Sequence, residues 1–516
     1  MKKTIFLILS VVSLLAGCAV NPVTGTRELA LVSESQELNL GREQFEPGRQ
    51  MQGGDYILEP GLTRYVNQVG QRLAAVSDRE LPYEFMVLNN STPNAWTLPG
   101  GKIAVNRGLL VELQNEAELA AVLGHEIVHA AARHGAKNME RGLFLQGALL
   151  AAGIAARESD YSRYVVGGAE MAAVLISGKY SRDAEREADY YGMLYMARAG
   201  YDPEAAVGLQ ETFVRLQEGG SANWLSGLFA SHPPSQERVA ANRKALQSFP
   251  PGGRLGIESY RREVAYLLKT KEGYDALVEG RKALAEDDAA RAMSFAEKAL
   301  AVEPREGHFH ALQGDVYIAR KMYNQAMDSF DRAIDRNSGY FYYYLRRGLT
   351  KQELGEYMSA NVDLRKSTDL LPTATAYNAM GELALAGGNT RAAMEHFSKA
   401  AASDSDSGRA ARFSLIQLDL PQNPDRYLRS EVQLGGDFAL VRVYNPTPVS
   451  IQSVGFVIEY IDKQGNLRRT DPYLLGGVPA GGTISTRVWM GPFDGADATK
   501  AAGIRFMQAV VNDARN

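Results

Sequence analysis

A repeat of 33 or 34 residues in the second half of the chain constrains its fold more than any other feature. A glycine recurs with this period, and a small residue follows each glycine after twelve and after nineteen positions. These residues are Gly280, Gly314, Gly348 and Gly381; Ala292, Ala326, Ala360 and Ala393; and Ala299, Ala333, Ser367 and Ala400. Small side chains let the two helices of a hairpin approach closely, and stacked hairpins bury each other's apolar faces. The period therefore predicts a stack of helical hairpins over residues 273–405.

The larger residues of the repeat agree with this interpretation. Tyr317 and Phe330 occupy apolar positions of one repeat, and Pro304 and Pro372 lie at repeat ends, where proline stops a helix. Together these positions resemble the tetratricopeptide repeat. The resemblance implies an α-helical solenoid with a concave surface that docks other proteins, and we place it at residues 260–420.

Proline and glycine divide the rest of the chain, whose 516 residues are enough for about three domains. Residues 249–253 read Phe-Pro-Pro-Gly-Gly, which no helix can cross, and a second break follows at residues 421–424. We therefore expect domains at residues 19–250, 260–420 and 425–516. In the last of these, alternating apolar residues at 438–444, 454–460, 483–489 and 504–511 predict a small β-sandwich.

Residues 19–250 combine both kinds of periodicity. Helical spacing predicts a helix at 63–76, and alternation predicts a strand at 83–88. Residues 95–98 and 102–106 are predicted to form two short strands around a Pro-Gly-Gly corner, and helices dominate from 116 to about 246. This domain is therefore expected to be mainly α, in the α+β class.

The first eighteen residues predict secretion. Lys2 and Lys3 precede an apolar run that ends in Leu-Ala-Gly-Cys at Cys18, which is typical of a signal peptide. The tetrapeptide resembles the bacterial lipobox, whose cysteine is lipidated and becomes the mature N-terminus. Cys18 is the only cysteine in the chain, so it has no disulfide partner. We expect a periplasmic protein with a lipid anchor at Cys18, and Ala19 after the cysteine favours the outer membrane.

Charge and hydropathy exclude two other classes of protein. The chain has 56 Lys and Arg against 60 Asp and Glu, so it lacks the positive field that collects phosphates, and nucleic acid is not an expected partner. The apolar segment at 143–156 has fourteen residues, which is short of the roughly 20 needed to cross a bilayer. We interpret it as a buried helix or one that lies at a membrane surface.

The chemistry is predicted by the sequence His125-Glu126-Ile-Val-His129, which lies in a helical stretch. Residues four apart on a helix face the same side, so the two imidazoles can bind one metal ion. Neutral imidazole suits zinc, and a catalytic zinc site keeps one position open for water. Glu126 is then placed to take a proton from that water.

The third ligand is expected on a second helix, where Glu185 and Asp189 lie four residues apart on one face. We assign Glu185 to the metal and Asp189 to the far nitrogen of a ligand histidine, an interaction that fixes the tautomer of the ligand. Glu187 is the alternative ligand. His134 lies five residues after His129, off the metal face, and is interpreted as a surface residue. His308, His310 and His396 are interpreted as ordinary helix residues of the repeats.

His-Glu-x-x-His, followed by Glu-x-x-Ala-Asp some sixty residues later, resembles the zinc peptidase family that includes the prenyl-protein endopeptidases and the heat-shock protease HtpX. Asn94-Ala95-Trp96 and Pro-Gly-Gly at 99–101 resemble its strand and corner ahead of the metal helix. The resemblance covers residues 30–245 and implies a zincin-like fold with one Zn²⁺ and a substrate-binding edge strand at residues 94–96. It also implies that His232 approaches the metal or the substrate oxyanion, as a switch ligand in repeat-bearing relatives, with Arg238 in the same motif.

These features predict a zinc endopeptidase that cleaves misfolded or stalled envelope proteins and supports outer-membrane protein assembly. The repeats are expected to dock on the assembly machinery or on its unfolded clients. The alternative is a chaperone or scaffold for that assembly whose protease site is latent.

Overall fold

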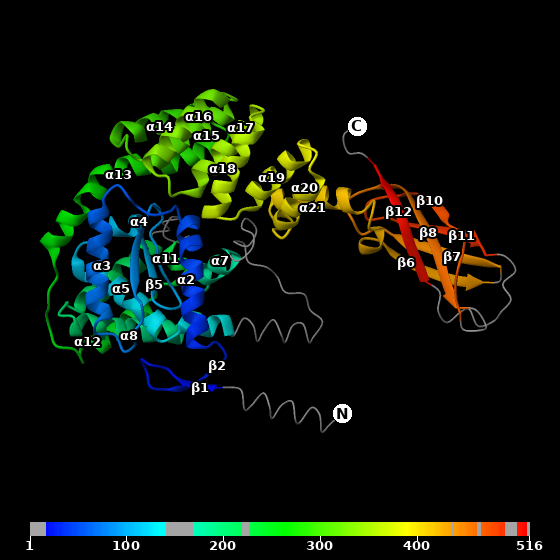
Figure 1. Ribbon diagram of the computed structural model, residues 1–516. Coiled ribbons are helices and arrows are strands. Elements are labelled where there is room, and N and C mark those ends of the chain that lie inside the picture. The colour runs from blue at the N-terminus through cyan, green and yellow to red at the C-terminus, as the bar shows by residue number, and fades with distance from the viewer. Residues whose placement is uncertain are drawn as a thin grey trace, which may run out of the picture. The chain divides into compact units, whose positions relative to one another are not determined.

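The computed structural model describes residues 17–140, 169–218, 227–435, 437–461, 466–490 and 503–512. Most of the predicted signal peptide and the whole apolar segment 143–156 lie outside these ranges. The chain forms two compact units, Met1–Pro372 and Thr373–Asn516 (Figure 1). Among the described residues, no helix has both the length and the hydropathy that crossing a bilayer requires.

A three-stranded sheet organises the N-terminal half of the first unit, with the strand order β3-β5-β4. β3 (Glu84–Leu88) is parallel to β5 (Lys102–Asn106), whereas β4 (Ala95–Leu98) is antiparallel to it. Gly100 and Gly101 form the corner between β4 and β5 at φ 77° and 79°, the left-handed region that favours glycine. The two strands and the corner predicted from the sequence are therefore present, and β4 lies at an edge of the sheet.

Helices surround this sheet, and a hairpin precedes it. The hairpin consists of β1 (Gly17–Val20) and β2 (Arg27–Ala30). The helices are α2 (Glu34–Met51), α3 (Pro60–Ala74), α4 (Arg107–Leu110), α5 (Glu116–Ala131), α7 (Ala169–Ser177), α8 (Arg182–Arg198), α9 (Glu204–Glu218), α11 (Leu228–Ser231) and α12 (Gln236–Leu246). The prediction of a mainly α domain in the α+β class is confirmed.

The first turn of α5 is fixed by a buried carboxylate. Asn115 caps the helix by accepting a hydrogen bond from the Glu118 amide. Glu116, 3% exposed, then accepts hydrogen bonds from the hydroxyls of Tyr65, Tyr201 and Ser259 at 2.7–2.9 Å. It also forms ion pairs, each at 3.0 Å, with Arg72 and Arg254. These partners come from α3, from the segment that follows α8, from the segment that precedes α13 and from α13 itself, so one side chain joins the metal helix to its surroundings.

Two glycines bring α5 and α8 together. A Cβ atom at Gly124 of α5 would lie 3.1 Å from the carbonyl oxygen of Gly192 on α8. A Cβ atom at Gly192 would lie 3.1 Å from the amide nitrogen of His125. Because neither position has a side chain, the two backbones approach closely, and residues near the start of α8 can reach those in the second half of α5.

Residues 257–419, which are all described, form the helical repeats (Figure 1). In the first unit the hairpins are α13 (Ile257–Ala285) with α14 (Ala289–Val302), α15 (Gly307–Ala319) with α16 (Tyr323–Arg336), and α17 (Phe341–Glu353) with α18 (Tyr357–Leu370). The repeat glycines face large side chains; a Cβ atom at Gly314 would lie 2.7 Å from the Phe330 ring. The eight small residues that follow the glycines are all buried. The helical-repeat prediction is confirmed.

The first repeats pack against the N-terminal half through buried polar contacts. Asn89 donates a hydrogen bond to Glu306 at 3.0 Å, and Tyr274 donates one to the same carboxylate at 2.5 Å. His308 Nε2 lies 3.0 Å from the carbonyl oxygen of Gly53. One apolar core continues from the N-terminal half into the first repeats. His308 thus contacts the N-terminal half and is not only an ordinary helix residue of the repeats. The chain divides into compact units after Pro372, and the domain boundary predicted near residue 250 stays a prediction.

The second unit contains the fourth hairpin and two antiparallel sheets. Its helices are α19 (Ala374–Ala386), α20 (Thr390–Ala400) and α21 (Asp406–Asp419), with a 3₁₀ turn at Pro424–Arg426. One sheet has the order β11-β7-β6, and the other has β10-β8-β12 with β9 beside β8. The strands are β6 (Arg429–Gly435), β7 (Phe438–Tyr444), β8 (Ile451–Ile461), β9 (Leu467–Arg469), β10 (Tyr473–Val478), β11 (Thr483–Trp489) and β12 (Gly503–Val511). Both sheets contribute to one apolar core, which agrees with the predicted sandwich.

Candidate metal centre

Two histidines on α5 form one side of the candidate site. His125 and His129 lie one helical turn apart, and their Nε2 atoms are 3.0 Å from each other. Both rings are held by α5, whose first turn and close contact with α8 are described above. The side chain of Glu126 is buried next to His125. The structure therefore places the three residues of the motif as the helical spacing predicts.

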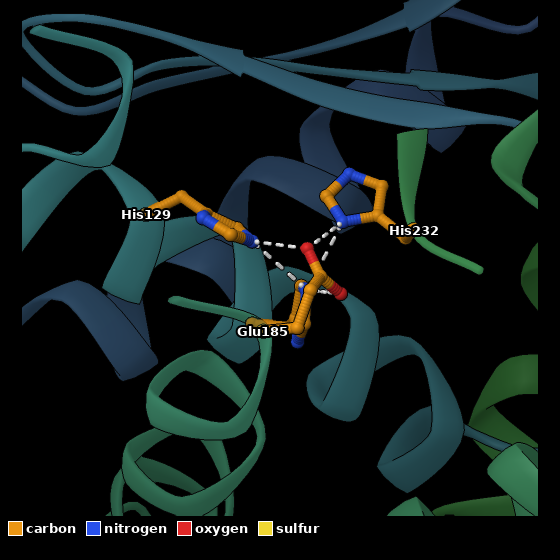
Figure 2. Close-up of side chains that lie close together, drawn as sticks. His129, Glu185 and His232 are labelled. Carbon is orange, nitrogen blue, oxygen red and sulfur yellow. Dashed lines mark hydrogen bonds and ion pairs between the residues drawn. The ribbon is translucent and has the colours of Figure 1, made fainter. Parts of the chain in front are cut away.

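Glu185 and His232 complete the cluster. The Oε1 atom of Glu185 lies 3.4 Å from His129 Nε2, and its Oε2 atom lies 3.5 Å from His125 Nε2. His232 follows α11 directly, and its Nδ1 atom is 2.9 Å from Glu185 Oε1 and 3.3 Å from His125 Nε2. Figure 2 shows His129, Glu185 and His232 converging on one point. Glu187, the alternative ligand, is not part of this cluster.

The spacing of these four residues fits one zinc ion. Their ligand atoms all lie within 4.8 Å of one another. Zinc binds imidazole nitrogen and carboxylate oxygen at about 2.0–2.2 Å in tetrahedral geometry, which puts ligand atoms roughly 3.3–3.5 Å apart. The close pairs among the three imidazole nitrogens and the two Glu185 oxygens are 2.9–3.5 Å apart. The donor set of three imidazoles and one carboxylate is thus suited to one metal ion, and zinc is the ion that these ligands prefer.

The electrostatics of the cluster favour a cation. Burial alone would raise the pKa of Glu185, but the nearby charge of His232 and hydrogen bonds from His125 and His129 outweigh it and hold that pKa well below its usual range. Burial raises the pKa of Glu126. Glu126 Oε2 is a buried acceptor for which the described residues supply no hydrogen-bond partner. An unpaired carboxylate oxygen beside the cluster is available to accept a proton from a bound molecule.

Asp189 and Arg238 support the cluster from behind. Asp189 Oδ1 lies 3.1 Å from His125 Nδ1, the ring nitrogen that faces away from the other ligands. Arg238 donates from Nε and Nη2 to the two oxygens of Asp189 at 2.8 and 2.7 Å, and its Nη1 lies 2.9 Å from Glu185 Oε2. Burial would raise the pKa of Asp189, but Arg238 and His125 together lower it. An ionised Asp189 fixes the tautomer of His125, as the sequence analysis assigned it.

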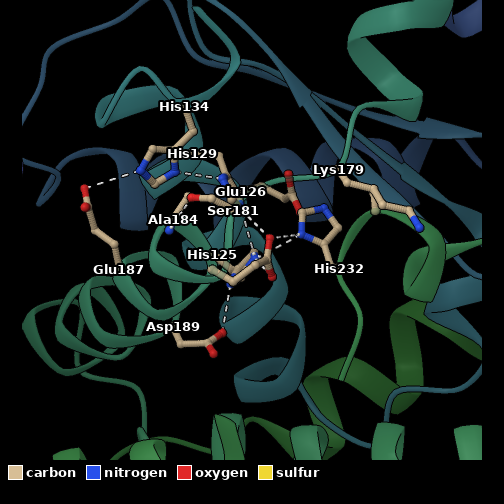
Figure 3. Close-up of polar contacts among 12 residues, drawn as sticks. His125, Glu126, His129, His134, Lys179, Ser181, Ala184, Glu187, Asp189 and His232 are labelled. Carbon is tan, nitrogen blue, oxygen red and sulfur yellow. Dashed lines mark hydrogen bonds and ion pairs between the residues drawn. The ribbon is translucent and has the colours of Figure 1, made fainter. Parts of the chain in front are cut away.

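The prediction for His134 is wrong, since the residue is buried at 3% exposure and contacts a ligand. α5 ends at Ala131, and Arg133 adopts φ 62°, so the chain turns back instead of continuing along the helix. His134 Nδ1 then lies 2.9 Å from His129 Nδ1, and its Nε2 lies 3.4 Å from Glu187 Oε1 (Figure 3). Helical spacing misplaced this residue because the helix does not reach it.

Tyr180 lies beside the cluster but was not predicted as a site residue. Its ring stacks on His129 with a centroid distance of 3.8 Å and an interplanar angle of 21°. Burial and the carboxylates of Glu126 and Glu185 raise its pKa, so the hydroxyl stays neutral. Tyr180 precedes α8 and lies outside the His-Glu-x-x-His motif, so spacing alone gave no signal for it.

The predicted edge strand lies beside a cleft. β4 pairs with β5 on one side only, and the side chains of Ala95 and Trp96 are buried at 0% and 3% exposure. Asn94 lines a cleft of about 410 Å³ with Thr92, Ala173, Ile176 and Ser231, among other residues. Because the side chains of the strand point into the core, it can offer its backbone to an extended peptide.

Comparisons with known proteins agree with this geometry. The sequence pattern of Peptidase family M48 matches residues 60–246. Metalloprotease YcaL of Escherichia coli (strain K12) is 32% identical over 192 residues, which are 35% of this chain and 72% of that protein. The mitochondrial metalloendopeptidase OMA1 of Schizosaccharomyces pombe is 35% identical over 222 residues, 42% of this chain and 63% of that protein.

A third relative shares a longer segment. The beta-barrel assembly-enhancing protease of Escherichia coli (strain K12) is 27% identical over 237 residues, which are 45% of this chain and 48% of that protein. The chain thus spans about half the length of this relative. The family match at residues 60–246 includes His125, His129, Glu185 and His232, and with the similarity to YcaL it shows that the chain belongs to Peptidase family M48.

Proposed function

We propose that this chain is a zinc-dependent endopeptidase whose ligands are His125, His129 and Glu185. The observation that carries the proposal is the cluster of ligand atoms within 4.8 Å of one another, with the unpaired, buried carboxylate oxygen of Glu126 beside it. Two histidines from one helix and a glutamate from a second helix form the ligand set called gluzincin. Membership of the peptidase family supports the same reaction class.

When bound, zinc polarises a carbonyl and lowers the pKa of water toward 7. Glu126 takes the proton from the attacking water and passes it to the leaving amine, so that one water is added across the peptide bond. Its buried position raises its pKa, which makes it a stronger base than an exposed glutamate. The backbone at residues 94–96, where β4 begins, holds the substrate extended in the adjoining cleft. Backbone pairing demands few particular side chains, so sequence selectivity is low.

His232 acts as a latch in this proposal. Its Nδ1 lies within 3.3 Å of both His125 and Glu185, at the position that a catalytic zinc site keeps open. A fourth protein ligand closes the site and holds the enzyme latent. The alternative role for His232 is to stabilise the oxyanion, because its Nε2 faces the reaction side at 3.5 Å from Glu126 Oε1. The two roles predict opposite effects of substitution: His232→Ala raises activity if the residue is a latch and lowers it if it binds the oxyanion.

The experiment compares three purified full-length proteins: wild type, Glu126→Gln and Glu211→Gln. Each is assayed for bound zinc and for digestion of unfolded casein. Glu126→Gln keeps its zinc and loses at least 100-fold in rate, since general bases contribute roughly 10²–10⁴-fold. Glu211→Gln, which removes a surface ion pair with Arg243 on α9 and α12, keeps both zinc and activity. Proteolysis by Glu126→Gln at the wild-type rate would exclude the role given to Glu126.

The cellular role is a further part of the proposal. One relative's name links it to beta-barrel assembly, and the signal-like N-terminus of this chain fits secretion to the periplasm. We place the protein on the outer membrane through lipidated Cys18, with misfolded or stalled envelope proteins as substrates. The helical repeats would dock the assembly machinery or its clients. Cys18→Ala should move the protein from the membrane fraction to the soluble periplasmic fraction; an unchanged distribution would count against the anchor.

A second candidate function is a scaffold or chaperone for outer-membrane assembly with a latent protease. The features that favour it are the long repeat array and the fourth ligand His232 in the cluster. Cells carrying Glu126→Gln separate the two candidates. A scaffold keeps outer-membrane protein levels normal in this strain, whereas a protein that acts by proteolysis does not.

A further inference from the structure

We propose that His134 is a positioning residue for the metal ligand His129. In this inference, which rests on the proposed metal site, His134 and Glu187 form a hydrogen-bonded chain behind the ligand. Figure 3 shows His129, His134 and Glu187 in this order. The hydrogen-bonded chain ends on Asn21, at the start of the loop in the N-terminal hairpin. This hydrogen-bonded chain of side chains increases the zinc affinity without contacting the ion.

The positions of the ring protons determine which nitrogen donates and which accepts in each hydrogen bond behind His129. His129 points Nε2 at His125 and Glu185, so a neutral His129 that ligates through this atom carries its proton on Nδ1. That proton lies between His129 Nδ1 and His134 Nδ1, which are 2.9 Å apart. His134 must therefore accept through Nδ1, and its own proton sits on Nε2. From there it points at Glu187 Oε1, 3.4 Å away.

The contact between His134 and His129 is buried. His134 is 3% exposed and the His129 side chain is 0% exposed, so water cannot replace either partner easily. The ring of Tyr180 covers the face of His129 at 3.8 Å. If the acceptor at His134 were lost, the buried Nδ1–H of His129 would have no partner in this position, and leaving a buried donor unpaired is unfavourable. The ring could then turn or change tautomer, and either change would take Nε2 away from the metal.

The N-terminal hairpin holds the far end of the chain. Asn21 is 2% exposed, and its Nδ2 donates to Glu187 Oε1 at 3.0 Å, while its Oδ1 accepts from the Val23 amide at 2.9 Å. Glu28 of β2 forms an ion pair with Lys137 at 2.5 Å, which ties the hairpin to the segment that carries His134. Glu187 Oε1 thus accepts from Asn21 and lies opposite His134 Nε2, so one carboxylate oxygen joins the hairpin to the histidine.

The two ligand histidines of α5 thus have different supports. His125 is supported directly by Asp189, an anion that Arg238 neutralises. His129 is supported by a neutral imidazole, with the anion Glu187 one residue further away. Partners of this kind commonly contribute a factor of roughly 10–100 in metal affinity. We assign a contribution of this size to the zinc affinity to His134.

The experiment measures zinc dissociation constants of full-length variants by competition with a chromophoric chelator. His134→Leu, which has no acceptor, should bind zinc roughly 10–100-fold more weakly than wild type. His134→Asn, whose Oδ1 can accept from His129 Nδ1, should recover most of this loss. The Co²⁺ absorption spectrum, which reports ligand geometry, should change in the leucine variant and stay near wild type in the asparagine variant. His310→Leu removes a buried histidine of the repeats that bonds a backbone carbonyl, and it should leave both readouts unchanged.

Wild-type zinc affinity in His134→Leu, or equal losses in His134→Leu and His134→Asn, would overturn the inference. If His134→Leu does not fold, Glu187→Gln and Glu187→Leu replace it, because only glutamine keeps an oxygen acceptor at a half-buried position. Equal zinc affinity in these two variants would overturn the inference as well. His125→Ala separates the failure of this inference from the failure of the proposed metal site. If His125→Ala binds zinc as tightly as wild type, the metal site itself is refuted. An effect of His125→Ala without one of His134→Leu refutes His134 alone.

Discussion

The close contact of α5 and α8 gives the most direct test of how the fold builds the site. We predict that Gly192→Ala weakens both folding and zinc binding. The new Cβ atom would lie 3.1 Å from the amide nitrogen of His125, 3.3 Å from the carbonyl carbon of Gly124 and 3.4 Å from His125 Cα. All three atoms belong to the backbone of α5, so no side chain can rotate away. The helices must separate by a few tenths of an ångström.

Two opposing terms set the magnitude. Overpacking a close contact costs about 1–3 kcal/mol, and replacing glycine by alanine inside a helix returns about 1 kcal/mol. We expect a net loss of up to about 2 kcal/mol in the free energy of unfolding. Glu185 lies two turns from Gly192 on the same helix, so a separation of the helices also lengthens its distances to His125 and His129. Catalytic groups need placement within about 0.5 Å, so zinc affinity should fall as well.

The assay is thermal unfolding of the full chain, with and without zinc, alongside chelator competition. A loss of up to about 2 kcal/mol corresponds to a fall of at most a few degrees in the unfolding temperature. Gly208→Ala in α9 is the matched control, because a Cβ atom there meets nothing within 4 Å. It should stabilise the helix by up to about 1 kcal/mol and leave zinc affinity unchanged. If Gly192→Ala is as stable as Gly208→Ala and binds zinc like wild type, the close approach does not position the site.

Three further variants test other parts of the molecule. Gly381→Ala puts a Cβ atom 2.5 Å from the buried ring of Phe397, so we expect it to destabilise the second unit by about 1–3 kcal/mol, measured by limited proteolysis. Glu116→Gln removes a charged acceptor from three hydroxyls, so we expect the free energy of unfolding, measured in urea, to fall by about 2 kcal/mol. The ion pairs with Arg72 and Arg254 contribute little to this loss because both arginines are half exposed. Burial, together with the charges of Arg281 and Arg107, lowers the pKa of His308 well below its ordinary 6.5. Below about pH 6.5 the unfolded chain therefore binds a proton that the folded chain does not, and the free energy of unfolding falls as the pH drops. His308→Gln should reduce this dependence between pH 6.5 and 5.5.

Each of these variants has an outcome that would contradict its physical reason. Proteolysis of Gly381→Ala at the wild-type rate would mean that the hairpin can open without cost. Unchanged stability of Glu116→Gln would show that its partners find other acceptors. For His308, the relevant quantity is the difference between variant and wild type, because this difference cancels the pH dependence that the two proteins share; identical pH profiles would refute the interpretation.

The spacing of residues along the sequence was sufficient to predict the repeats and the metal motif. The small residues of the repeat keep a constant period because each hairpin presents the same close contact to its neighbour, so sequence distance maps directly onto structure. The same is true of His125 and His129, whose separation by one helical turn is a property of the helix itself. The alternating strands at 438–444 and 483–489 were predicted with the bounds that the structure has.

His134 marks the limit of that reasoning. Counting along a helix assumes that the helix continues, but α5 ends at Ala131 and Arg133 turns the chain back. His308 was misjudged for a related reason, because its partner Gly53 lies 255 positions away in the sequence. Contacts of this kind depend on two segments that meet only in the folded chain.

The sequence by itself determined which helices and strands form and which side chains carry metal-binding chemistry, because these follow from periodicity and from the nature of imidazole and carboxylate. Only the tertiary structure decided that His134 contacts His129 and that the first repeats share a core with the metal-binding half. The physical reason is that backbone geometry fixes local spacing. The meeting of distant residues instead depends on how closely helices such as α5 and α8 can pack.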